Sequence, residues 1–345
     1  MIARLLSHDL PRSRWLAALL LLIVAGLALA PFVFPGSKAL GVAAKMLVFI
    51  LLVASYDLLL GYTGIVSFAH TMFFGIGAYG VAIASTQMGA GWAAVAVGLL
   101  LALVTSLALA LVIGLFSLRV KAIFFAMITL AVAAAFQTLA SQLSDFTGGE
   151  DGLSFRNPAL LSSANDNGRL LTYYLLFVVV VVLFLALLRI VNSPFGRVLQ
   201  AIRENDFRAE AIGFRTVVYR TLSNVLSAGF ASVAGALLAL WLRYTGPDTT
   251  LGFEVMLDIL LIVVIGGMGT MYGAVIGAVL FVFAQNYLQD GLRLASAALS
   301  DVPALSAVFT PDRWLLWLGL LFVLSVYHFP SGVVGRLRAW AGSRR

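Results

Sequence analysis

Long uninterrupted apolar runs constrain this sequence more than any other feature. Several of them reach about 20 residues, the length of helix that crosses a hydrocarbon core about 30 Å thick. Hydrophobic residues make up 62% of the 345 residues and charged residues only 11%, which leaves too little polar surface for a water-soluble domain. The alternating segments of about ten residues that mark a transmembrane barrel do not occur. The sequence therefore predicts an all-α, polytopic membrane protein.

Breaks in hydropathy at Gly, Pro and charged residues divide the chain into about ten apolar segments. The segment at 254–266 is short for a full span, and the one at 64–86 is interrupted by glycines. The first resembles a signal peptide, but its length and the proline that follows favour an uncleaved span. The predicted segments are 15–34, 42–60, 64–86, 92–117, 122–142, 170–190, 215–241, 254–266, 270–289 and 312–329.

The distribution of basic residues predicts the orientation of these segments. If the N-terminus is cytoplasmic, 15 of the 22 Lys and Arg residues fall on the inner side, as the positive-inside rule requires. Both termini are then cytoplasmic, with residues 1–14 and a basic tail at 330–345 flanking a transmembrane domain at 15–329. The polar loop at 143–169 faces outward.

A charged stretch, SPFGRVLQAIRENDFRAEAIGF at 193–214, interrupts this apolar chain on the predicted cytoplasmic side. Phe195, Val198, Leu199 and Ile202 recur at helical spacing, which predicts a short amphipathic helix. Glu204 and Arg208 lie four residues apart and would pair on its polar face, and Ser193-Pro194 and Gly213 mark its ends. Such a helix could anchor on lipid headgroups or form a docking surface for a cytoplasmic partner.

Two glycine-rich segments lie in the two halves of the chain, GYTGIVSFAHTMFFGIGAYG at 61–80 and VIGGMGTMYGAVIGAVL at 264–280. Gly269, Gly273 and Gly277 are four residues apart, so on one helix they would share a face that allows close helix packing. Paired segments of this kind indicate an internal pseudo-repeat around a central pathway.

Two titratable residues lie within or near the predicted spans. His70 is a candidate functional residue by its depth, and the alternative is a hydrogen-bonded packing residue. Asp57 lies near the inner end of its span, where we expect a solvated or capping carboxylate rather than a proton carrier.

Several classes of site are excluded by composition. The chain has no cysteine, so it cannot form disulfides or thiolate metal sites. Its three histidines lack metal-ligand spacing and no phosphate-binding GxxxxGK[ST] motif occurs, so the sequence predicts no metal site and no ATP site in this chain.

In chain order, GYTGIVSFAHTMFFGIGAYG, TGGEDGL, SPFGRVLQAIRENDFRAEAIG and VIGGMGTMYGAVIGAVLF resemble the LivM-type permeases of branched-chain amino acid ABC importers. The resemblance covers roughly residues 40–330, and the third motif is the most specific. It implies that 193–214 is the coupling helix, which seats in a cleft of a cytoplasmic ATPase. The motif positions that the resemblance assigns to ATPase coupling are Gly196, Arg197, Ala201, Arg203, Glu204, Asn205, Ala209 and Gly213.

The same resemblance implies a transport subunit that is not itself an enzyme and has no catalytic residue. A second, LivH-type permease subunit, two ATPase subunits that carry ATP and Mg, and a periplasmic binding protein would complete an importer in the bacterial inner membrane. The residues we assign to a translocation pathway or its packing are His70, Thr71, Phe73, Phe74, Gly75, Gly266, Gly267, Gly269 and Gly273.

The sequence departs from the broad importer signature, because Glu210-Ala211 is followed by Gly213 and no proline occurs in 214–241. The resemblance is therefore to the branched-chain subgroup, whose members move leucine, isoleucine and valine or else urea, amides or aromatic acids. The alternative function is a secondary transporter coupled to protons or sodium, for which Asp57 is the candidate carboxylate. An intramembrane enzyme is disfavoured, because no His/Asp/Ser or metal constellation lies at membrane depth.

Overall fold

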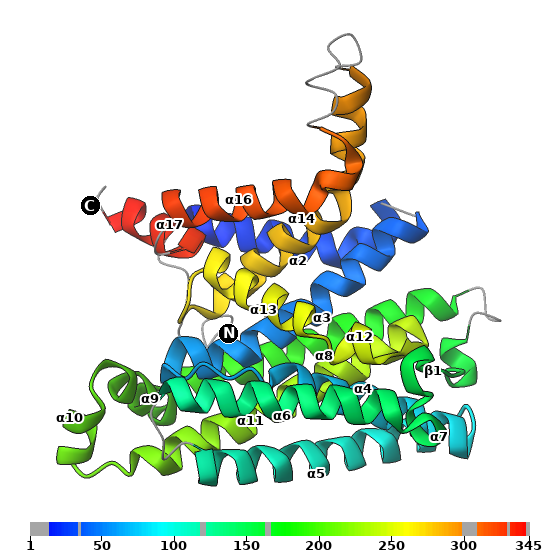
Figure 1. Ribbon diagram of the computed structural model, residues 1–345. Coiled ribbons are helices and arrows are strands. Elements are labelled where there is room, and N and C mark those ends of the chain that lie inside the picture. The colour runs from blue at the N-terminus through cyan, green and yellow to red at the C-terminus, as the bar shows by residue number, and fades with distance from the viewer. Residues whose placement is uncertain are drawn as a thin grey trace. The chain divides into compact units, whose positions relative to one another are not determined.

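The computed structural model describes residues 14–33, 36–117, 122–162, 167–298, 309–329 and 332–342, and this part of the chain is almost entirely helical (Figure 1). Nine of the described helices are long and apolar enough to cross a membrane. The all-α, polytopic prediction is confirmed.

Each of the ten predicted apolar segments corresponds to a helix. Only α4 lies outside the nine candidate spans, and the short α13 forms a span together with α12. The helices are α2 (Arg14–Val33), α3 (Ser37–Thr63), α4 (His70–Met88), α5 (Trp92–Ser117), α6 (Ala122–Gln142), α8 (Gly168–Val191), α11 (Thr216–Leu242), α13 (Phe253–Gly266), α14 (Met271–Ala298) and α16 (Trp314–His328).

Shorter elements connect or follow these helices. They are α7 (Ser144–Thr147), α9 (Pro194–Glu204), α10 (Asp206–Ala211), α12 (Pro247–Thr250), α17 (Gly332–Gly342), the strands β1 (Leu153–Ser154) and β2 (Tyr244–Thr245), and single 3-10 turns at Gly149–Asp151, Ala159–Leu161 and Pro311–Arg313. The predicted basic tail is thus helical from Gly332.

The described chain forms two compact units, one made of Leu47–Leu260 and one that combines residues 14–46 with those from 261 onward. In the first unit α4, α5 and α11 pack together as the core (Figure 1). A Cβ atom on Gly77 would lie 1.8 Å from the Ser232 carbonyl oxygen, and one on Gly235 would lie 1.8 Å from that of Phe74. Glycine at these positions lets the backbones of α4 and α11 touch.

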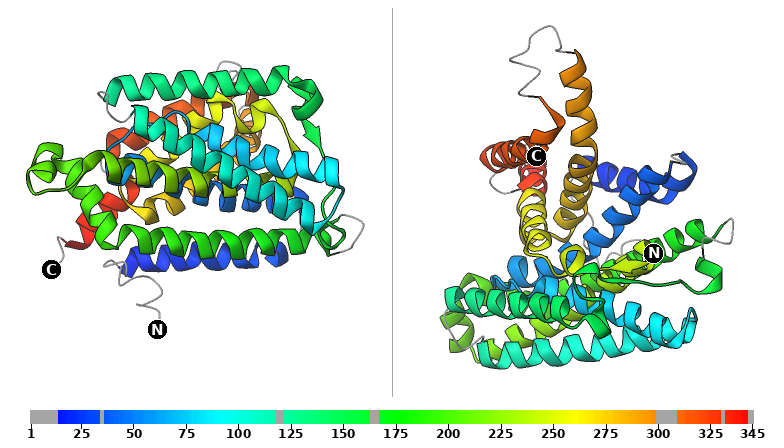
Figure 2. Two further views of the ribbon diagram at one scale, coloured as in Figure 1. Left: turned by 90° about the horizontal axis from the view of Figure 1, so that it is seen from below. Right: turned by 45° about the vertical axis from the view of Figure 1, so that its right-hand side comes forward.

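The two ends of the first unit differ in character (Figures 1 and 2). At one end β1, which lies in the loop predicted to face outward, pairs antiparallel with β2, with Leu153 opposite Thr245. The segment α9–α10 lies at the other end. The predicted outer loop and the predicted cytoplasmic segment therefore occupy opposite ends of this unit, as the orientation prediction requires.

In the second unit the second glycine-rich segment forms a tight turn between α13 and α14. Gly267 and Gly269 have φ angles of 112° and 79°, which glycine adopts without the steric cost of a side chain. Gly269 precedes the start of α14 at Met271, so the prediction that it shares a helix face with Gly273 and Gly277 is wrong. The physical reason is that the turn needs left-handed backbone there.

Gly273→Leu is expected to destabilise this hairpin. A Cβ atom at Gly273 would lie 2.4 Å from Thr270 Oγ1 and 2.9 Å from the Gly266 carbonyl oxygen, and overpacking of this kind commonly costs about 1–3 kcal/mol. Gly291→Leu is the matched control, because Gly291 lies in the same helix with nothing within 4 Å of its added Cβ. Thermal unfolding should show a lower melting temperature for Gly273→Leu than for Gly291→Leu. Equal melting temperatures would contradict the close packing at Gly273.

Candidate functional site

The predicted coupling segment begins with a tight connection from α8 to α9. A Cβ atom on Gly196 would lie 2.0 Å from the Val191 carbonyl oxygen, so glycine is required where α9 crosses the end of α8. Leu199 and Ile202 are buried at 0% and 1% exposure, and Phe195 stacks on Tyr219 of α11 with ring centroids 5.8 Å apart. The predicted apolar face is confirmed and packs on the protein itself.

The segment is two helices rather than the single helix that the sequence predicted. Asn205 has extended backbone, and its side-chain Oδ1 accepts a hydrogen bond from the Arg208 backbone N–H at 3.0 Å. Asparagine is a strong N-cap residue, so it ends α9 and starts α10. The predicted Glu204–Arg208 pair is therefore wrong as an intrahelical pair, because the two residues lie on different helices.

Arg203 joins this segment to the end of α3. Its Nη1 donates to the carbonyl oxygen of Gly61, one of the last carbonyls of α3, which have no partner within the helix. A cation there is also favoured by the helix dipole. A Cβ atom on Gly64, whose φ is 74°, would lie 3.1 Å from Arg203 Cγ, so the glycine leaves room for the arginine stem. The first and third sequence motifs are thus in direct contact.

Two contacts hold α10 on α11. Asp206 forms an ion pair with Arg220 at 2.9 Å, and Glu210 accepts a hydrogen bond from Thr216 Oγ1 at 2.6 Å. Ala209 is buried, with 2% of its surface exposed. Asp206 and Glu210 therefore fix the position of α10, and Phe207 stays exposed.

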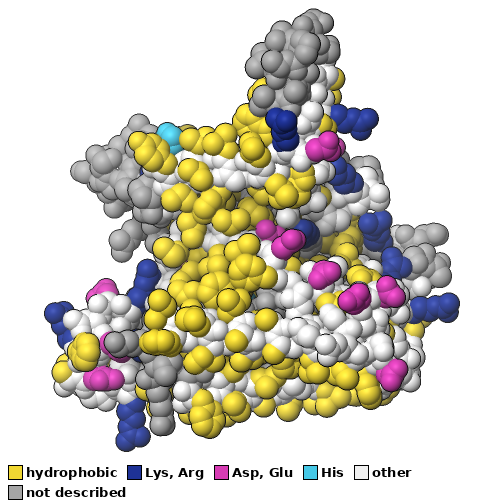
Figure 3. Space-filling view, in the orientation of Figure 1, with side chains coloured by type: hydrophobic (Ala, Val, Ile, Leu, Met, Phe, Trp, Pro, Cys, Tyr) yellow, Lys and Arg dark blue, Asp and Glu magenta, His cyan; other side chains and the backbone are white. Residues whose placement is uncertain are grey.

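Phe207 and Ile212 are 86% and 67% exposed on this otherwise charged segment. Charged side chains of both signs gather at this end of the first unit, whereas hydrophobic side chains cover much of the helix surface beyond it (Figure 3). Aromatic residues are enriched at protein–protein interfaces, which have a polar rim, so an exposed Phe among charged side chains indicates a protein-binding surface. We call the exposed side chains of Arg197, Glu204, Phe207, Arg208 and Ile212 the α9–α10 surface.

His70 is fully buried and joins α4 to α3. Its Nε2 lies 2.9 Å from Ser55 Oγ and 3.3 Å from the Leu52 carbonyl oxygen. Ser55 donates its own proton to Leu52 at 2.7 Å, so His70 Nε2 must be the donor. The bond agrees with the second of the two alternatives, a hydrogen-bonded packing residue, and a part of His70 in a pathway stays a prediction.

Hydroxyl contacts continue this polar seam to α11. Ser227 donates to the Ser55 carbonyl oxygen at 2.5 Å, and Thr63 Oγ1 lies 3.0 Å from Ser223 Oγ. These partners are far apart in sequence, so sequence patterns gave no signal for them. Together with Arg203 they connect the end of α3 to both α9 and α11.

The remaining residues assigned to a pathway or its packing are interior residues. Thr71, Phe73 and Phe74 are at most 1% exposed, and a Cβ atom on Gly75 would lie 2.2 Å from a methyl carbon of Leu251. In the second unit Gly266 packs on Gly273. Their packing is evident, and their part in a pathway stays a prediction.

Asp57 is 1% exposed, so the prediction of a solvated carboxylate is wrong. It lies nearly two turns before the end of α3 at Thr63, deeper than its predicted span boundary implied. Within the described residues no group of three or more His, Cys, Asp or Glu side chains could hold a metal ion.

Comparison with known proteins identifies similar chains over most of this length. The family model described as branched-chain amino acid transport system / permease component matches residues 38–326. The high-affinity branched-chain amino acid transport system permease protein LivM of Salmonella typhimurium is 26% identical over 325 residues, 87% of this chain and 74% of the relative.

A second permease type is also similar to this chain. The high-affinity branched-chain amino acid transport system permease protein LivH of Escherichia coli is 27% identical over 302 residues, 83% of this chain and 91% of the relative. A probable LivM protein of Methanocaldococcus jannaschii is 26% identical over 242 residues, 68% of each chain. No solved structure matches.

Proposed function

The chain belongs to the family of branched-chain amino acid transport system permease components, and from that premise we propose that it moves branched-chain amino acids across the bacterial inner membrane. It does so as the permease subunit of an ATP-driven importer. The observation that carries the proposal is the similarity to LivM proteins over most of both chains. The chain is itself a transport component and not an enzyme.

We propose four kinds of subunit in the complete importer. The similarity to LivH as well as LivM proteins supports a pair of related permeases, one of them this chain. Two ATPase subunits on the cytoplasmic side would bind ATP and Mg, and a periplasmic protein would deliver the substrate. The α9–α10 surface supports the ATPase part of this proposal, because Phe207 and Ile212 are apolar, exposed and held on a firmly packed support.

In this proposal one ATPase subunit receives the α9–α10 surface of this chain in a cleft. The exposed Phe207 side chain would become buried there, with Arg197 and Glu204 at the rim. When the cleft moves, Phe207 carries α10 and α9 with it, and the buried Leu199 and Ile202 couple α9 to the rest of this chain. Arg203 transmits the displacement to α3 through Gly61, and the Ser227–Ser55 and Thr63–Ser223 contacts relay it to α11.

A competition experiment tests the substrate class. In vesicles that contain the complete transport complex, unlabelled isoleucine and valine should suppress uptake of labelled leucine. Urea, short amides and aromatic acids should not compete at the same concentrations. If one of these compounds competes and isoleucine and valine do not, the substrate of this chain belongs to another class within the family.

Cysteine labelling tests the proposed orientation, in which both termini are cytoplasmic. The chain has no native cysteine, so Asp151→Cys and Asp206→Cys each introduce one reactive thiol, at opposite ends of the first unit (Figures 1 and 2). Asp151→Cys should react with an impermeant maleimide in intact cells, and Asp206→Cys only after the inner membrane is opened. The reverse pattern would invert the orientation.

A further inference from the structure

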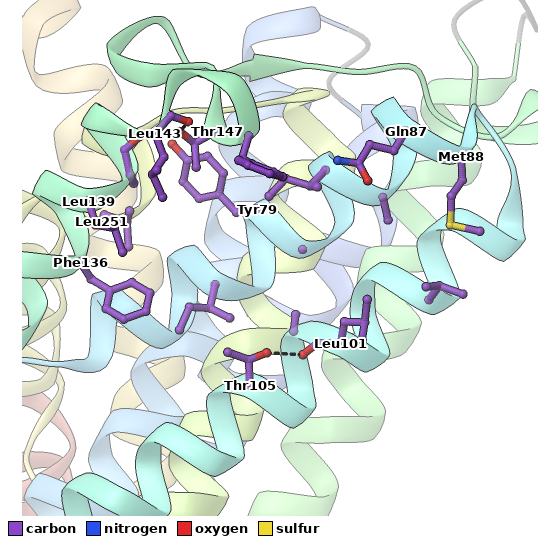
Figure 4. A pocket seen from close by; sticks show the side chains of 18 residues that line it. Tyr79, Gln87, Met88, Leu101, Thr105, Phe136, Leu139, Leu143, Thr147 and Leu251 are labelled. Atoms are coloured by element: carbon purple, nitrogen blue, oxygen red, sulfur yellow. Dashed lines mark hydrogen bonds between the residues drawn. The ribbon is translucent and has the colours of Figure 1, made fainter.

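A pocket of about 430 Å³ lies in the first unit between α4, α5 and α6, next to α7 (Figure 4). Its size lies in the range of roughly 300–1,000 Å³ that small-molecule sites occupy. The lining side chains are uncharged and mainly aliphatic or aromatic, and Tyr79, Gln87, Thr105 and Thr147 supply the polar groups. The lining therefore suits a long apolar ligand with polar atoms at one end.

One polar group in the pocket lacks a partner. Tyr79 is 6% exposed, and among the described residues its hydroxyl has no hydrogen-bond partner. The other lining hydroxyls are satisfied, because Thr105 donates to Leu101 at 2.8 Å and Thr147 donates to Ala140 at 2.5 Å. A buried hydroxyl without a partner is unfavourable. The Tyr79 ring lines the pocket, so a small shift of this side chain would let its hydroxyl donate to a ligand oxygen there.

The depth of Tyr79 can be worked out from the helices. His70 contacts Ser55, which lies eight residues before the end of α3 at Thr63, or about 12 Å at 1.5 Å per residue. Tyr79 lies nine residues further along α4, about 13 Å more. The hydroxyl is thus roughly 25 Å from the cytoplasmic end of α3, near the far edge of a hydrocarbon core about 30 Å thick. Ester and phosphate oxygens of lipids begin at that depth.

The mouth of the pocket opens onto apolar helix surface. Leu101 and Leu139, which line it, are 57% and 48% exposed, and Leu100 and Val104 beside them on α5 are 61% and 57% exposed. On helices of a membrane protein such side chains contact lipid. The pocket is therefore continuous with the lipid-facing surface.

We propose that this pocket binds one acyl chain of an outer-leaflet phospholipid, with an ester or phosphate oxygen of that lipid accepting a hydrogen bond from Tyr79. A branched-chain amino acid fits less well, because its ammonium and carboxylate lie close to a short side chain and no charged residue lines the pocket. The lipid would fill the gap between α5 and α6 and support the packing of both on α4.

Quenching by labelled lipid tests the site in the intact transport complex. Thr105 lines the pocket, and Val104 is its exposed neighbour on α5. Each is replaced by cysteine and labelled with bimane, in vesicles that contain a phospholipid with a nitroxide on its acyl chain. We expect saturable quenching of the Thr105 label at low mole fractions of that lipid. The Val104 label should be quenched in proportion to bulk lipid. Identical curves at both positions would overturn the proposal.

Tyr79→Phe separates hydrogen bonding from shape. It removes a hydroxyl that has no partner in the protein, so folding should be unaffected or improved. In the Thr105→Cys background we expect half-saturation to require about threefold to tenfold more labelled lipid, the range that the loss of one hydrogen bond gives. An unchanged curve would contradict the role of Tyr79. Relief of quenching by leucine would show that the pocket belongs to the substrate route instead.

Discussion

Replacing Phe207 by aspartate is expected to lower substrate uptake at least tenfold while leaving the protein in the membrane. Phe207 is 86% exposed, so the change removes no internal packing. Burial of an aromatic side chain at an interface contributes about 2 kcal/mol or more, and a carboxylate in the same cleft would be unfavourable without a partner. Co-purification of the ATPase subunit and substrate-stimulated ATP hydrolysis, measured beside uptake, report the loss of docking.

Two control variants make this result specific. Phe207→Leu keeps an apolar side chain and should retain most of the uptake. Gln200→Asp introduces the same charge at another exposed position of α9, away from the proposed anchor, and should change uptake by less than about threefold, as expected for an exposed charge. Normal ATPase binding and uptake in Phe207→Asp would show that the α9–α10 surface is a membrane anchor.

Arg203→Met is expected to uncouple ATP hydrolysis from transport. The variant loses the hydrogen bond to the Gly61 carbonyl, and hydrogen bonds to charged groups are worth about 1.5–3 kcal/mol. ATPase binding should persist, because Phe207 and Ile212 are unchanged. Uptake should fall about tenfold, as a free-energy change near 1.4 kcal/mol implies. Because ATP hydrolysis persists, more ATP is hydrolysed for each substrate molecule imported.

Neighbouring substitutions distinguish this role from a merely structural one. Arg203→Lys keeps the charge but loses the planar fork, and should give an intermediate ratio of ATP hydrolysed to substrate imported. Glu204→Gln changes the adjacent exposed residue and keeps the Arg203–Gly61 hydrogen bond, so it should leave that ratio unchanged. An equal loss of uptake and ATP hydrolysis in Arg203→Met would mean that the residue acts in docking instead.

The spans were predictable because length and apolarity are properties of contiguous sequence. The start of α9 was also predictable, because the helix begins at Pro194, directly after Ser193, as the Ser-Pro signal indicates. The break at Asn205 was missed because the helical spacing of apolar residues continues past it, although Asn-Asp is itself an N-cap signal. At Asn205 the N-cap residue, and not the amphipathic pattern, determines where the helix ends.

The functional contacts were less predictable, because their partners are distant in sequence. Gly61 lies 142 residues from Arg203, and Ser55 lies 172 residues from Ser227. Phe207 lies outside the apolar face that the spacing of Phe195, Leu199 and Ile202 predicts, and no sequence pattern indicated that it would be 86% exposed. The burial of Asp57 was not predicted, because the predicted span ends at residue 60 whereas α3 continues to Thr63.

The most direct test of the proposed function is to measure which energy source drives uptake. Vesicles containing the complete complex and the binding protein should accumulate leucine only when ATP is enclosed with the ATPase subunits, and proton and sodium ionophores should leave the initial rate unchanged. Uptake driven by an ion gradient without ATP, and abolished by Asp57→Asn, would contradict the account and identify the chain as an ion-coupled transporter.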